Sequence, residues 1–111
     1  CDVTVFRKKR YSSRHVAEEM VKKVNIKGKD VVIVDDIIST GHTIIEAAKK
    51  ARNLGAKSIT AICVHGLFVE NAVKKLKKAK INNIFSTNCI EHKTNSIDIS
   101  SIIIKELNKT R

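Results

Sequence analysis

The chain has 111 residues, of which 42% are hydrophobic and 30% are charged, and its formal net charge is +11 at pH 7. This length and composition predict a single globular domain and exclude a disordered or fibrous chain. No apolar run approaches the ~20 residues of a membrane span and no basic and apolar leader opens the chain, so we expect a cytoplasmic protein without a membrane partner.

The excess of positive charge could attract the phosphate backbone of a nucleic acid. However, aromatic residues, which would stack on bases, make up only 4% of the chain. Most lysines fall on the outer faces of expected helices, as in residues 74–78. We therefore interpret the basic residues as solvated helix surfaces and do not expect a nucleic-acid partner.

The first 24 residues contain three expected segments. Residues 1–6 alternate polar and apolar side chains, which predicts a strand. Residues 7–14 are mostly cationic, so they form either a mobile flap that closes over a polyphosphate or a plain solvated connection. Val16, Met20 and Val24 recur at steps of four, which predicts a short amphipathic helix over residues 15–24. Because the chain starts inside a predicted strand and lacks an initiator Met, we expect it to be part of a longer polypeptide.

Residues 31–43 are the centre of the sequence pattern. They open with four β-branched apolar residues, which predict a strand buried on both faces, as in a parallel sheet covered by helices. Asp35 and Asp36 follow at the carboxyl end of this strand, where ligands bind in open α/β sheets. Small and hydroxylated residues then lead into a helix, so that backbone N–H groups and hydroxyls can converge on one anion. The alternative is an ordinary strand–turn–helix with acidic residues near the helix start.

The rest of the chain alternates between helices and strands. We expect helices over residues 43–53, 69–79 and 100–107, and strands over residues 58–64, 82–87 and 97–99. Cys63 lies in the first of these strands, where burial as a small apolar side chain is expected, and His65 follows near the same sheet edge as the acids. This order predicts an α/β fold with an open parallel sheet, helices on both faces and right-handed crossovers.

The run at residues 31–43 resembles the signature of proteins that bind phosphoribosyl pyrophosphate, which reads hydrophobic strand, Asp-Asp, two apolar residues and Ser/Asp-Thr-Gly-Gly-Thr. The resemblance implies a type I phosphoribosyltransferase-like domain in which Asp35 and Asp36 hold the ribose hydroxyls. It also implies that the loop wraps the 5-phosphate of ribose 5-phosphate with Ser39, Thr40, Gly41, His42 and Thr43. His42 stands at the position of the second Gly of the signature, so a positive φ there would be strained.

Further segments make the sequence similar to the ribose-phosphate pyrophosphokinases. Lys8-Lys9-Arg10 is similar to the Lys-x-Arg that this family carries on a flexible loop upstream of its Asp-Asp motif. Residues 64–68 and 87–90 resemble family segments after the next two strands, although Asn88 replaces an acid there. The similarity covers residues 1–111 and implies the C-terminal domain of an enzyme of the archaeal kind, whose N-terminal half is absent.

This resemblance implies a magnesium-dependent enzyme that transfers diphosphate from ATP to O1 of ribose 5-phosphate, in a homo-oligomer. Lys8 and Arg10 would be catalytic, because positioned cations stabilise the negative charge that spreads over the transferring group. Asp35 would hold Mg²⁺ through the ribose hydroxyls. Two alternatives stay open: a phosphoribosyltransferase that uses the same loop, and a non-catalytic nucleotide-sensing or RNA-binding regulator with the same fold.

Overall fold

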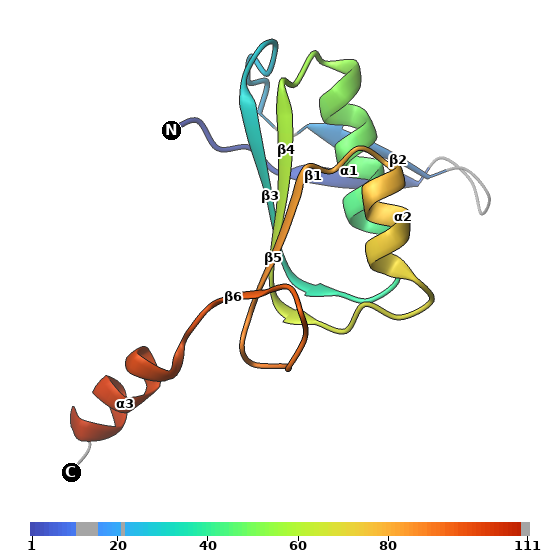
Figure 1. The fold of residues 1–111 in the computed structure, drawn as a ribbon. Helices are drawn as coiled ribbons and strands as arrows, with labels where there is room; N and C mark the ends of the chain where they lie inside the picture. The colour runs from blue at the N-terminus through green and yellow to red at the C-terminus, as the bar shows by residue number, and fades with distance from the viewer. Residues whose placement is uncertain (11–15, 21, 110–111) are drawn as a thin grey trace.

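A parallel sheet forms the centre of the molecule (Figure 1). The structure is a computed structural model that describes residues 1–10, 16–20 and 22–109, with the backbone alone for residues 7–10 and 16–20. The sheet has the strand order β3-β4-β5-β6, and its strands are β3 (Asp30–Ile38), β4 (Ser58–Gly66), β5 (Asn83–Thr87) and β6 (Asn95–Ile97). The helices are α1 (His42–Asn53), α2 (Ala72–Lys78) and α3 (Ser100–Lys109). The predicted α/β fold with an open parallel sheet is confirmed. The helices expected on both faces are found on one face within the described residues, because α1 and α2 share one core and α3 has no buried residue.

The hydrophobic core lies between the sheet and the two helices α1 and α2. The buried side chains of β4 alternate along the strand and face those helices, as expected for a half-covered strand. Three alanines of α1 let the helix approach the sheet closely, and Leu76 of α2 is completely buried beside them. The core cluster contains Ile26, Ile38, Ile44, Ala48, Ala51, Ala56, Ile59, Ala61, Cys63, Leu76 and Ile81. Cys63 is buried as predicted, and desolvation raises the pKa of its thiol, so the reactive thiolate is disfavoured.

The N-terminal predictions were wrong in their details. The strand starts later than residues 1–6, because β1 covers Phe6–Arg10 and takes in cationic residues that were assigned to a loop. The segment predicted as a helix contains β2, Val16–Met20, which pairs with β1 in an antiparallel hairpin. A step of four residues also returns to the same face of a strand, so the spacing of Val16 and Met20 fits both structures. The register places Arg7 opposite Glu19 and Lys8 opposite Glu18, an arrangement that favours strand pairing.

The central strand β3 also differs from its prediction. It lies at one edge of the four-stranded sheet, and only one of its faces is turned to the helices. On the other face, Val32 is 56% exposed and Val34 is 71% exposed. The expected burial on both faces is therefore not found within the described residues.

Three later elements are shifted or shortened. β6 begins two residues before the expected edge strand. α2 starts only at Ala72, because Glu70 and Asn71 have φ values of 54° and 59°, which a right-handed helix cannot contain. α3 points away from the sheet in Figure 1 and has no buried residue. In the described part of the chain, no helix is long and apolar enough to span a membrane.

Arg52 connects the end of α1 to the loops that precede β4 and β5. Its Nη2 donates to the carbonyl oxygen of Lys80 at 2.6 Å and to Oδ1 of Asn82 at 2.9 Å. Its Nη1 donates to the carbonyl oxygens of Ala56 and Lys57. These are charge-assisted hydrogen bonds in a fixed fork geometry, which a lysine cannot reproduce.

We expect Arg52→Ala to lower the free energy of unfolding by about 2 kcal/mol, because it removes hydrogen bonds from a charged group and leaves carbonyl acceptors without it. Arg52→Lys should recover less than half of this loss. The control is Lys50→Ala, an exposed position on the same helix, which should change stability by less than about 0.5 kcal/mol. Urea unfolding followed by circular dichroism measures all three, and equal stability of the wild type and Arg52→Ala would contradict the role of this fork.

Candidate functional site

A small cavity lies where β3 passes into α1. It has a volume of about 120 Å³ and is lined by Asp35 and by residues 37–44. One wall is therefore a carboxylate at the carboxyl end of the strand, and the other is the loop that starts the helix. The structure thus brings together Asp35 and the predicted loop residues Ser39, Thr40, Gly41, His42 and Thr43.

Gly41 determines how the loop turns into α1. Its φ of 86° lies in the left-handed region, which glycine adopts at little cost. A Cβ atom at this position would lie 3.2 Å from Cδ2 of Leu76 and 3.8 Å from Cβ of Ala72, so α2 packs directly against the loop backbone. His42 is the first residue of α1 and does not have a positive φ. The predicted strain at His42 is therefore absent, because the left-handed position falls one residue earlier.

The start of α1 is suited to an anion. The first backbone N–H groups of a helix have no partner within the helix, and the helix dipole adds positive potential there. Gly41, as the residue before the helix, has no side chain that could cap them, and the first turn contains no acidic residue. With twelve residues, α1 has a full-length dipole behind this end. An anion in the cavity would meet backbone donors, and the hydroxyls of Ser39 and Thr40 would lie beside it.

The two acids of the motif have different surroundings. Asp35 is half-buried and lines the cavity, whereas Asp36 is exposed and does not line it. Asp35 Oδ1 accepts a hydrogen bond from the backbone N–H of Asp36 at 2.8 Å, and Asp36 Oδ1 accepts one from the N–H of Ile37 at 2.8 Å. The pKa of Asp36 lies below its usual value, first because of a side-chain hydrogen bond with Asp35, then because of the Ile37 N–H, with a smaller effect of His65. Asp36 therefore stays ionised at neutral and mildly acidic pH.

The loop after β4 fixes the cavity from the side. The backbone N–H groups of Leu67 and Phe68 both donate to the carbonyl oxygen of Ile38, at 2.9 and 3.1 Å. The N–H of Val69 donates to the carbonyl oxygen of Ser39 at 3.0 Å. The sequence does not indicate that these residues belong to the site, because backbone hydrogen bonds between distant loops leave no residue pattern.

Phe68 occupies the centre of this second loop. Its backbone has a φ of 47°, and a Cβ atom on Gly66 would collide with its ring. The ring also lies against His92, with 4.5 Å between the ring centroids. The glycine after His65 was the one sequence signal that could have indicated this close approach.

The remaining residues that the sequence singled out lie in three different parts of the structure. Lys8 and Arg10 lie in β1, and the position of their side chains relative to the cavity is outside the described structure. His65 pairs with Ile37 in the sheet register, so it does lie at the same sheet edge as the acids, as predicted. Asn88 donates from Nδ2 to Asp98 Oδ1 at 2.9 Å and links the end of β5 to the start of α3. The asparagine thus has a structural partner in the position where the acid was expected.

Comparisons with known proteins agree with this fold. A sequence model of the family described as phosphoribosyl synthetase-associated domain matches residues 13–109, which is most of the chain. The chain belongs to the phosphoribosyl synthetase-associated domain family. A solved structure of phosphoribosylpyrophosphate synthetase from Mycobacterium smegmatis has a TM-score of 0.70 and 22% identity, and covers 89% of this chain and 34% of that one. This similarity confirms the fold of the domain.

Curated relatives carry the name that the sequence motifs resemble. Ribose-phosphate pyrophosphokinase 2 of Archaeoglobus fulgidus is 41% identical over 107 residues, which are 96% of this chain and 39% of that protein. The ribose-phosphate pyrophosphokinase of Pyrococcus abyssi is 44% identical over 100 residues, 90% of this chain and 34% of that protein. The resemblance to this enzyme family is confirmed, and the domain spans less than two fifths of the length of these two relatives.

Gly41 provides a test of the loop geometry. We expect Gly41→Ala to lose about 1 to 3 kcal/mol of stability from its positive φ and to weaken sugar-phosphate binding, because the loop must move away from Leu76. Gly28→Ala is the matched control, since Gly28 also has a positive φ of 71° but nothing lies within 4 Å of an added Cβ. It should lose stability without losing binding. Thermal unfolding and calorimetric titration with ribose 5-phosphate distinguish the two variants, and equal binding would refute the role of the Gly41–Leu76 contact.

Proposed function

We propose that this domain is the C-terminal, phosphoribosyltransferase-like part of a ribose-phosphate pyrophosphokinase, with residues 1–111 following an N-terminal half. The enzyme transfers diphosphate from ATP to O1 of ribose 5-phosphate and produces phosphoribosyl pyrophosphate and AMP for nucleotide biosynthesis in the cytoplasm. The observation that carries this proposal is the cavity in which Asp35 faces the loop at the start of α1. The names of the relatives support the reaction.

The loop is proposed to bind the 5-phosphate. A phosphate at the start of α1 gains backbone N–H donors and the positive end of the helix dipole. The backbone hydrogen bonds from Leu67, Phe68 and Val69 hold the loop in this shape before the ligand arrives. Such preorganisation reduces the entropy lost when the phosphate binds.

The two acids are proposed to bind the ribose. Ionised carboxylates only accept hydrogen bonds, and the 2- and 3-hydroxyls of ribose can donate them. Asp35 stands in the cavity wall next to the phosphate loop, while Asp36 is reachable from solvent. The lowered pKa of Asp36 keeps it in the accepting form over the physiological range. A phosphate and two hydroxyls recognised together specify a ribose 5-phosphate rather than a free phosphate.

Mg²⁺ is the metal that these groups fit. Carboxylate oxygens are hard ligands, and Mg²⁺ usually keeps several waters and uses one or two protein carboxylates plus substrate oxygens. Within the described residues, no three His, Cys, Asp or Glu side chains come together to hold a metal by themselves. Asp35 therefore suits a Mg²⁺ that is also held by the ribose hydroxyls. When bound, the ion would neutralise phosphate charge and orient the sugar.

Lys8 and Arg10 are proposed to neutralise the diphosphoryl group during transfer. Both lie in β1, which precedes the site in the chain. The transferring group spreads its charge over several oxygens, which positioned cations stabilise more strongly than they stabilise the substrate. The ATP site requires the N-terminal half of the enzyme, and a homo-oligomer is the expected assembly.

The complete polypeptide tests the reaction itself. With Mg²⁺, ATP and ribose 5-phosphate, we expect equal amounts of AMP and phosphoribosyl pyrophosphate, and residues 1–111 alone should form neither. Asp36→Asn should weaken ribose 5-phosphate binding at least about tenfold, because an uncharged amide accepts more weakly than a carboxylate. Asp30→Asn, at the other end of β3, is the control and should bind as the wild type does. Consumption of phosphoribosyl pyrophosphate with a nucleobase, without AMP formation, would instead identify a phosphoribosyltransferase.

The cations of β1 should act on turnover. In the complete enzyme, we expect Lys8→Ala and Arg10→Ala to lower kcat at least about a hundredfold and to change the KM for ribose 5-phosphate less than about threefold, because the lost contacts form in the transition state. Lys9→Ala is the control, since it is not part of the Lys-x-Arg pattern, and it should change kcat less than about threefold. Steady-state kinetics measure this. A rise in KM with unchanged kcat would show that the segment only binds substrate.

A further inference from the structure

The loop between β5 and β6, residues 88–94, has no role in the proposed reaction. It lies at the same end of the sheet as the candidate site (Figure 1). β3, β4 and β5 run parallel, so their carboxyl ends and the loops that follow them meet at this edge. One aromatic contact connects residues 88–94 to the loop after β4, which anchors the cavity loop.

Asn95 holds residues 88–94 in one conformation. Its Nδ2 donates to Oγ of Ser86 at 2.9 Å and to the carbonyl oxygens of Thr87 and Ile90 at 2.9 and 3.0 Å. Its Oδ1 accepts a hydrogen bond from the N–H of His92 at 3.0 Å. One amide side chain therefore joins the end of β5 to the middle of the loop, and a connected polar network of this kind rigidifies the segment.

The ring of His92 is oriented by Thr94. The backbone N–H of Thr94 donates to Nδ1 of His92 at 3.2 Å, so this nitrogen acts as an acceptor. Oγ1 of Thr94 lies 2.9 Å from the same nitrogen and 2.8 Å from Oγ of Ser86, which is completely buried. These hydrogen bonds fix one edge of the His92 ring, and the ring itself lies against Phe68.

Phe68 combines an unfavourable backbone conformation with a closely packed ring. Its φ of 47° lies in the left-handed region, which is costly for a residue with a side chain. A Cβ atom on Gly66 would collide with Cε2 of Phe68, so the ring packs directly on the Gly66 backbone. The ring centroids of Phe68 and His92 are 4.5 Å apart, with 35° between the ring planes, which is within the range of favourable aromatic pairs. The contact with His92 therefore helps to hold Phe68 in its unfavourable conformation.

The backbone at Phe68 connects this aromatic pair to the candidate site. The N–H of Phe68 donates to the carbonyl oxygen of Ile38 at 3.1 Å, and the N–H of Val69 donates to that of Ser39 at 3.0 Å. Ile38 and Ser39 line the cavity, whereas Phe68 and His92 do not. A chain of contacts thus runs from the β5–β6 loop to the cavity wall, and its first two members do not touch the ligand position.

We propose that His92 is a positioning residue for ribose 5-phosphate. Its ring holds Phe68, and the backbone at Phe68 holds the loop of residues 39–43 in the shape that binds the 5-phosphate. This inference rests on the proposed function, which assigns the 5-phosphate to that loop. The phosphate keeps the same contacts before and during transfer at O1. Loss of the His92 ring therefore weakens substrate binding and leaves the chemical step nearly unchanged.

Two variants of His92 separate the effect of its ring from that of its hydrogen bonds. His92→Asn removes the ring but keeps an acceptor, Oδ1, for the hydrogen bonds with Thr94, whereas His92→Phe keeps a ring and has no acceptor. In the complete enzyme, we expect His92→Asn to raise the Kd and the KM for ribose 5-phosphate about three- to tenfold, the range of an aromatic pair. It should change kcat less than about twofold. His92→Phe should bind ribose 5-phosphate within about twofold of the wild type. Calorimetric titration and steady-state kinetics measure these values.

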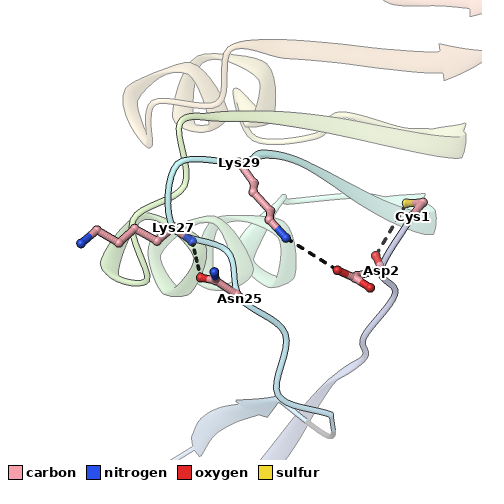
Figure 2. A network of polar contacts seen from close by, with 5 residues as sticks. All are labelled: Cys1, Asp2, Asn25, Lys27 and Lys29. Atoms are coloured by element: carbon pink, nitrogen blue, oxygen red, sulfur yellow. Dashed lines mark hydrogen bonds and ion pairs between the residues drawn. The ribbon is translucent and has the colours of Figure 1, made fainter.

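Three variants provide controls. Arg52→Ala removes the fork of hydrogen bonds at the end of α1, so it lowers stability at the other end of the sheet. Lys29→Ala removes the ion pair between Nζ of Lys29 and Oδ2 of Asp2, 3.6 Å apart, which lies before the amino end of β3 (Figure 2). Lys93→Ala changes an exposed neighbour of His92 in the same loop. All three variants should bind ribose 5-phosphate as the wild type does, because none of them changes the contact with Phe68.

Hydrogen exchange tests the contact without substrates. In the complete enzyme, the amides of Phe68 and Val69 should exchange at least about threefold faster in His92→Asn than in the wild type, and at the wild-type rate in His92→Phe. This readout does not depend on activity. Failure of the proposed function is seen separately, as a wild-type enzyme that forms no phosphoribosyl pyrophosphate.

The outcomes are distinct. Weaker binding of ribose 5-phosphate and faster exchange in His92→Asn alone support the proposal. Equal effects of the two His92 variants, including no effect, overturn it, and so does a larger effect of His92→Phe, because the ring is then not the group that matters. Weaker binding in His92→Asn with unchanged exchange at Phe68 and Val69 also overturns it, since the ring would not act through this backbone. A fall in kcat with unchanged KM overturns it as well.

Discussion

The close contact between the loop backbone at Gly41 and Leu76 of α2 is the constraint on which the candidate site depends. It is possible only because Gly41 has no side chain and can adopt a φ of 86°. The contact holds the start of α1 against α2, and the three backbone hydrogen bonds from residues 67–69 fix the same loop from the side of β4. Two segments that are distant in the sequence therefore hold one short loop in position, which is the condition for a preorganised phosphate site.

The acidic residues of the site are separated from the positive end of α1 by the loop. The first turn of α1 lacks acidic residues, whereas the two carboxylates stand one loop earlier, at the end of β3. The cavity thus offers a carboxylate acceptor on one side and the positive end of a helix on the other. The pKa of Asp36 is lowered first by the side-chain hydrogen bond with Asp35 and then by the Ile37 N–H, and His65, across the register from Ile37, has the smallest effect. Sheet pairing, rather than loop sequence, brings this histidine to the acids.

The domain is packed on one side of its sheet and exposed on the other. α1 and α2 bury Ile59, Ala61 and Cys63, while Val34 on the reverse face of β3 remains 71% exposed. The apolar sequence of residues 31–34 is typical of a strand that is covered on both faces and paired along both edges. Within the described residues, β3 is covered on one face and paired along one edge. The sequence of residues 31–34 therefore predicts more burial than the described residues provide. A continuous apolar surface is costly to leave in water.

The sequence alone determined the order of β3, α1, β4, α2 and β5 and the placement of Asp35 beside the Ser39–Thr43 loop, because strong periodicity and a specific motif are local properties. It could not separate helix from strand at Val16 and Met20, since a spacing of four suits both. The sequence motif also suggested a positive φ at His42, whereas the residue with the positive φ is Gly41. Only the tertiary structure decided the loop anchoring by residues 67–69, the burial of Leu76 on Gly41 and the edge position of β3. These features arise from contacts between segments far apart in the chain, where backbone hydrogen bonds and packing distances leave no mark on residue type.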